Sequence, residues 1–133
     1  MRERQGLTRA YGMLALAWAL LIVLQVFFAG LGIFGASGYA THRAFGNILH
    51  GLTAILLILA IIGPRTSRDI GMAAALVIVV TIQIGIVGAR DDAPGLAALH
   101  PVLALVAMGL AAHMGMHALR AGRPPDRVAA PAG

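Results

Sequence analysis

Residues 70–89 read IGMAAALVIVVTIQIGIVGA and contain no charged side chain. A helix needs about 20 predominantly apolar residues to cross the hydrocarbon core of a bilayer. The rest of the chain has the same character, because 59% of its 133 residues are hydrophobic and only 11% are charged. Its mean hydropathy is +0.87. These values exclude an ordinary soluble domain and predict an integral membrane protein.

Three further segments have a comparable length and apolar character. The four expected spans are 11–34, 41–62, 70–89 and 96–119. The connections between them are short and contain Gly, Pro, Ser and Asp, so consecutive helices are expected to run antiparallel. We therefore predict an all-α membrane protein, a four-helix transmembrane bundle of up-down-up-down topology covering 11–120. Residues 1–10 are expected to form a cytoplasmic segment, and 121–133, rich in Pro, Ala and Gly, a disordered tail.

The charges predict the topology. All ten basic residues are arginines, and eight of them flank the same side of the expected bundle. Only Arg43 and Arg90 fall on the other side. By the positive-inside rule both termini are cytoplasmic, and a bacterial inner membrane is the expected location. We therefore expect the net charge of +5 to orient the protein in the lipid bilayer. A nucleic-acid partner is not expected. Because the chain has no cysteine, it has neither disulfides nor thiolate metal sites.

A repeat relates the two halves of the chain. Gln25 precedes His42 by 17 residues, and Gln83 precedes His100 by the same 17, so a shift of 58 superposes both pairs. Polar and ionisable side chains are rare and costly inside a membrane, which makes the double coincidence informative. We therefore predict two tandem helical hairpins in which His42 and His100 occupy equivalent positions.

These two histidines are the candidate metal ligands. They lie at matched depth on helices that are diagonal in a four-helix bundle, where a flat macrocycle fits between them. Two neutral imidazoles can hold a haem iron at both axial positions. Gly46 and Ala104, one turn after each histidine, would leave room for the macrocycle. The alternative is that both histidines only bind lipid headgroups or loop carbonyls.

Other polar residues have weaker or open assignments. His50 is a second-choice ligand, which the shift of 58 pairs with Met108 rather than with a histidine. Gln25 and Gln83 either join helices by hydrogen bonds or contact the cofactor. Arg43 is placed where haem propionates would emerge.

The stretch HMGMH, residues 113–117, carries His113 and His117 at i and i+4. With Met114 and Met116 beside them, these histidines could hold Cu(I). The preferred alternative is that both point to water at the membrane surface.

The acidic residues argue against a proton-coupled pump or a small multidrug exporter, because none of the five lies within an expected span. They are Glu3, Asp69, Asp91, Asp92 and Asp126.

The segments HRAFG, LQVFFAG, IQIGIVG and ALHPVLAL resemble one four-helix unit of the haem A synthase family. The resemblance implies that His42 and His100 are axial haem ligands. The chain also resembles short four-helix bacterial membrane proteins of unknown function. It departs from the synthases in having Tyr39 in place of their glutamate, no outer-loop cysteine pair, and one four-helix unit instead of two. We therefore expect a b-type cytochrome or a haem carrier rather than a stand-alone methyl-oxidising enzyme.

The expected function is binding of one haem b, in electron transfer or haem handling. The candidate partners are a redox or haem enzyme and a second copy of the chain. One alternative is a cofactor-free scaffold or assembly subunit that contacts a membrane partner through small-residue faces. The other is a His/Met copper transporter.

Overall fold

The computed structural model describes residues 2–63 and 65–122, and within them it contains helices and no strand. The helices are α1 (Arg2–Ile33), α2 (Ala40–Ile62), α3 (Ser67–Val87), α4 (Pro94–Ala97) and α5 (His100–Ala121). Helices α1, α2 and α3, and the segment Pro94–Ala121 that contains α4 and α5, are long and apolar enough to cross a membrane. The prediction of an all-helical protein with four segments long and apolar enough to span a membrane is confirmed for the described residues. The expected disordered tail lies outside the described residues from 123 onward.

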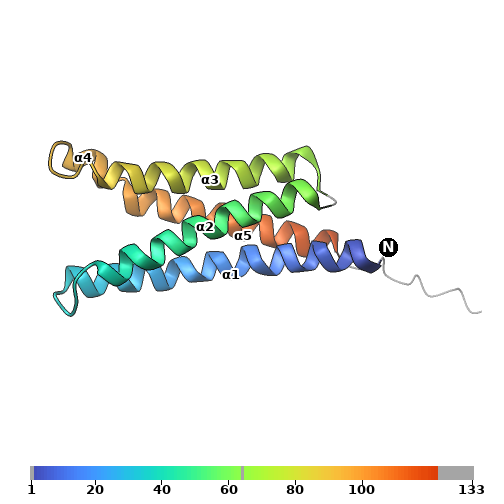
Figure 1. Cartoon of the computed structure of the whole chain (residues 1–133), viewed down its shortest axis with the longest axis horizontal. Coiled ribbons are helices and arrows are strands. Elements are labelled where there is room, and N and C mark those ends of the chain that lie inside the picture. The colour runs from blue at the N-terminus through green and yellow to red at the C-terminus, as the bar shows by residue number, and fades with distance from the viewer. Residues whose placement is uncertain (1, 64, 123–133) are drawn as a thin grey trace, which may run out of the picture.

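The four long helices form a closed ring of contacts. Both α1 and α3 pack against α2 and α5, so α2 and α5 occupy one diagonal of the bundle, and α1 and α3 the other. Figure 1 shows the start of α1 and the end of α5 at one end of the bundle, which we call the terminal end. The α1–α2 connection and α4 lie at the opposite end, the α4 end (Figure 1).

Two helices begin three or more residues earlier than the expected spans. Helix α1 starts at Arg2 rather than at residue 11. Its added turns contain no proline, and Glu3 in the first turn interacts favourably with the helix dipole. Helix α3 starts at Ser67 because Thr66 and Asp69 form a capping box, each side chain accepting the other's backbone N–H.

Glycine allows a close approach between helices where α1 meets α5. A Cβ atom added to Gly115 would lie 2.9 Å from the backbone oxygen of Gly12 and 2.6 Å from Cγ of Leu16. Such small-residue crossings let membrane helices pack backbone to backbone. Between α1 and α2 the buried Trp18 indole donates a hydrogen bond of 2.8 Å to the carbonyl of Leu49. These contacts fix α1 against both of its neighbours.

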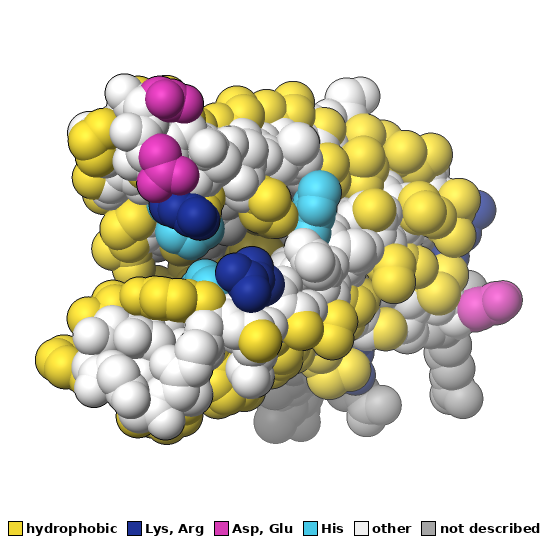
Figure 2. Space-filling model, turned by 60° about the vertical axis from the view of Figure 1, so that its left-hand side comes forward, with side chains coloured by type: hydrophobic (Ala, Val, Ile, Leu, Met, Phe, Trp, Pro, Cys, Tyr) yellow, Lys and Arg dark blue, Asp and Glu magenta, His cyan; other side chains and the backbone are white. Residues whose placement is uncertain are grey.

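The outer surface is apolar. Large hydrophobic side chains on every long helix remain exposed, including Leu20, Ile62, Ile78 and Leu105, and hydrophobic side chains cover much of the face in Figure 2. In water such a surface would promote association, whereas in a bilayer it contacts acyl chains. This arrangement is the one expected for a small bundle surrounded by lipid.

Candidate functional site

The two repeat-related histidines meet inside the α4 end of the bundle. His42 comes from the first turn of α2 and His100 from the start of α5, which are diagonal helices. Their ring centroids are 6.1 Å apart and their planes make an angle of 69°. Both rings are partly buried. The structure thus brings together two imidazoles that are 58 residues apart in the chain.

The two imidazole rings form equivalent hydrogen bonds. Nδ1 of His42 lies 3.1 Å from the carbonyl of Gln25, and Nδ1 of His100 lies 2.7 Å from the carbonyl of Gln83. Because a carbonyl oxygen only accepts, both Nδ1 atoms carry the proton, and the lone pair of each neutral ring lies on Nε2. An Nδ1–H bond to a backbone carbonyl is the usual way to orient a metal-binding histidine.

The glutamine side chains add polar groups from the other diagonal, α1 and α3. Nε2 of Gln25 donates to the carbonyl of His42 at 2.9 Å and lies 3.4 Å from Nε2 of the same histidine. Gly46 makes room for this amide, since a Cβ there would lie 2.8 Å from Nε2 of Gln25. The Gly46 space expected for a macrocycle is therefore occupied by the amide. Ala104, the repeat equivalent of Gly46, is buried in α5.

Two amide oxygens are left without partners. Oε1 of Gln25 and Oε1 of Gln83 are both buried, and within the described part of the chain neither accepts a hydrogen bond. A buried acceptor without a donor costs about 1–3 kcal/mol. The two atoms come from equivalent positions of the repeat, so each half of the bundle contains one unpaired amide oxygen of this kind among the described residues.

The rim of the site contains aromatic and charged groups. Tyr39 places its ring edge-on to His42, with 6.3 Å between centroids, and packs against Gly32 of α1. Arg43 is exposed, and Nε of Arg90 forms an ion pair of 3.6 Å with Asp91. Figure 2 shows histidine and arginine side chains gathered around a hollow in this part of the molecule.

The histidine pair fits a group that binds through two axial nitrogens. Metal–imidazole bonds are about 2 Å long, so two imidazoles on opposite sides of one metal place their centroids about 6 Å apart. The observed 6.1 Å agrees with this spacing. Within residues 2–63 and 65–122, no group of three or more His, Cys, Asp or Glu could hold a bare metal ion. Two imidazoles at this spacing are donors that a cofactor with its own equatorial ligands can use.

His50, the second-choice ligand, is bonded elsewhere. Its Nε2 lies 3.0 Å from Oγ1 of Thr81 on α3. The Thr81 hydroxyl itself donates to the carbonyl of Val77 at 2.8 Å, so it accepts the proton of His50 Nε2. In this arrangement Nε2 of His50 has no free lone pair and joins α2 to α3.

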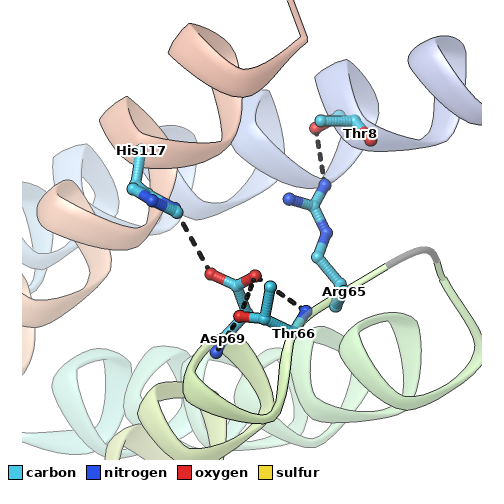
Figure 3. A network of polar contacts seen from close by, with 5 residues as sticks. All are labelled: Thr8, Arg65, Thr66, Asp69 and His117. Carbon is cyan, nitrogen blue, oxygen red and sulfur yellow. Dashed lines mark hydrogen bonds and ion pairs between the residues drawn. The ribbon is translucent and has the colours of Figure 1, made fainter.

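A second polar network lies at the terminal end (Figure 3). Oδ2 of Asp69 accepts hydrogen bonds from the backbone N–H and the hydroxyl of Thr66, and Oδ1 lies 3.3 Å from Nδ1 of His117. From the connection before α3, Arg65 donates to the carbonyl of Thr8 at 3.0 Å. These contacts join α3 to α5, and the α2–α3 connection to α1.

This network corrects one expectation from the sequence. Asp69 was placed outside the spans, but it lies in the first turn of α3 with 6% of its surface exposed, because the capping box extends the helix to include it. The signal was present as TSRD, residues 66–69, in which Thr-x-x-Asp precedes an apolar run. His117 is exposed but contacts this carboxylate. His113 is also exposed, and its ring stacks on that of His117 with 6.3 Å between the centroids.

The fold and these contacts define a four-helix membrane bundle with a histidine pair inside one end. Residues 25–90 match the model of a family described as a family of unknown function, DUF6220. The matched segment includes His42 and both glutamines and ends before His100. No curated protein and no solved structure matches the chain. The resemblance to haem A synthases therefore stays a prediction.

Proposed function

We propose that the protein is a small membrane cytochrome-like protein that binds one haem b between His42 and His100, and that it acts in electron transfer or haem handling. The observation that carries this proposal is the 6.1 Å spacing of two imidazoles whose Nδ1 atoms are both bonded to glutamine carbonyls. A histidine that only binds lipid headgroups near a helix end does not need a second imidazole beside it. Two that converge from diagonal helices support an axial pair.

The chain's residues would act in distinct ways on the cofactor. His42 and His100 supply the Nε2 lone pairs, and the carbonyls of Gln25 and Gln83 keep both rings in the correct tautomer and increase their basicity. The apolar helices limit access of water, which tunes the potential of a bound iron. When bound, haem supplies one-electron chemistry. Arg43 is available to pair with a propionate at the rim.

The proposal extends to topology and location. Five arginines, at the start of α1, around the start of α3 and at the end of α5, lie at the terminal end: Arg4, Arg9, Arg65, Arg68 and Arg120. By the positive-inside rule they support cytoplasmic termini, in the inner membrane of a bacterium. The histidine pair then lies in the outer half of the bilayer. With Tyr39 in place of the synthases' glutamate, we propose a carrier of electrons or haem that works with a redox or haem-enzyme partner.

The test is a visible spectrum of the detergent-purified protein, oxidised and reduced. We expect a low-spin ferric spectrum and a sharp reduced α-band. The variants His42→Ala and His100→Ala should each lose the low-spin signal. His50→Ala is the matched control, since His50 lies on the same helix but is bonded to Thr81, and it should retain that signal.

A colourless protein from haem-replete cells would refute the proposal. If such a protein co-purified with a larger membrane complex, the scaffold alternative would replace it.

A further inference from the structure

The two histidines differ at the nitrogen that would bind iron. Nε2 of His42 has the Gln25 amide nitrogen 3.4 Å away, whereas the structure gives Nε2 of His100 no hydrogen-bond partner among the described residues. The amide nitrogen of Gln25 can only donate, and the Nδ1 proton of His42 is already bonded to the Gln25 carbonyl. The amide therefore donates to the Nε2 lone pair of His42.

One lone pair cannot accept the amide proton and bind iron at the same time. The Gln25 amide is well placed to compete, because its other contact, 2.9 Å to the carbonyl of His42, holds it beside the ring. The absence of a side chain at Gly46 leaves room for it. At 3.4 Å the contact is long for a hydrogen bond and hence weak. Because the Gln25 amide competes only weakly, the His42 ring can exchange between the amide and the iron.

The hydrogen bonds of the two Nδ1 atoms also differ between His42 and His100. The bond from His100 to its glutamine carbonyl is 2.7 Å and that from His42 is 3.1 Å, so His100 is the more firmly oriented of the two rings. Tyr39 is the neighbour of the less firmly held ring. The pair is thus symmetric in sequence but not in its hydrogen bonds.

We infer that His100 is the permanent axial ligand and His42 a displaceable one, released onto the amide of Gln25, so that the site binds a small neutral diatomic ligand on the His42 side. This inference rests on the proposed haem site and adds a ligand class to it. The amide stabilises the released ring and so favours the external ligand. The function that follows is sensing or binding of a diatomic gas by a membrane protein.

The experiment measures carbon monoxide affinity of the reduced, detergent-purified protein by its visible spectrum. The wild-type protein should bind carbon monoxide with loss of the bis-histidine spectrum, because carbon monoxide would replace His42 while His100 stays bound. Gln25→Leu keeps the backbone carbonyl that orients His42 but removes the competing amide. Its carbon monoxide affinity should fall about twofold, the factor that a hydrogen bond at the weak end of the usual range contributes.

Gln83→Leu provides the matched comparison. It removes an amide from the equivalent position of the repeat, and among the described residues this amide forms no hydrogen bond with Nε2 of His100. General effects of losing a buried amide appear in both variants, so the difference between them reports the contact with His42. Equal affinities in the two variants would overturn the inference.

A second measurement does not depend on the glutamine variants. His42→Ala should retain five-coordinate haem that binds carbon monoxide, and His100→Ala should retain much less haem. Equal haem loss in both would contradict the assignment of a permanent and a displaceable ligand. A low-spin haem protein that binds no carbon monoxide would overturn this inference alone, whereas a colourless protein would overturn the proposed function with it.

Discussion

Replacing Gly115 by alanine tests the close contact between α1 and α5. The new Cβ would lie 2.6 Å from Cγ of Leu16 and 2.9 Å from the backbone oxygen of Gly12. A leucine side chain can rotate, but the backbone of α1 cannot move away from α5 without loosening the crossing. Extra methyl groups forced into a well-packed interior cost about 1–3 kcal/mol.

Gly109→Ala is the matched control for this change. Gly109 lies in the same helix, is exposed, and has nothing within 4 Å of the position of an added Cβ. Both substitutions gain about 0.5–1 kcal/mol from the lower backbone entropy of alanine. The difference between the two variants therefore isolates the overpacking cost, about 1–3 kcal/mol in favour of Gly109→Ala.

The assay is unfolding of the detergent-purified variants with increasing sodium dodecyl sulfate, followed by far-ultraviolet circular dichroism. We expect Gly109→Ala to unfold at or above the wild-type midpoint and Gly115→Ala clearly below it. If both variants unfolded at the same midpoint, α1 and α5 would not cross as closely as described, and the reasoning would fail.

Two more substitutions probe the polar contacts between helices. Asp69→Ala leaves the backbone N–H of Thr66 and the ring of His117 without their acceptor, and it should lower the free energy of unfolding by about 1–3 kcal/mol in the same assay. An unchanged midpoint would show that the capping box contributes nothing. Trp18→Phe removes the indole bond to the carbonyl of Leu49, and a loss of about 1 kcal/mol is expected. Stability equal to that of the wild type would mean that this bond is not formed.

The sequence alone predicted that the chain would form four apolar helices and that His42 and His100 would be equivalent. The length and hydropathy of each span depend only on the composition of that segment. The 17-residue spacing of Gln and His can be read directly from the sequence. The residues at which the helices begin were harder to predict from the sequence. A capping box adds residues to α3 through two short side-chain bonds that hydropathy does not detect.

Only the tertiary structure decided what the polar side chains contact. It turned Gln25 toward His42, filled the space at Gly46 with an amide, and bonded His50 to Thr81. These outcomes depend on the rotation of each helix about its axis and on its distance from its neighbours, which side-chain packing sets across the whole bundle. The sequence repeat determines that two histidines occupy equivalent positions. The unequal surroundings that make one ring different from the other arise only when the four helices pack.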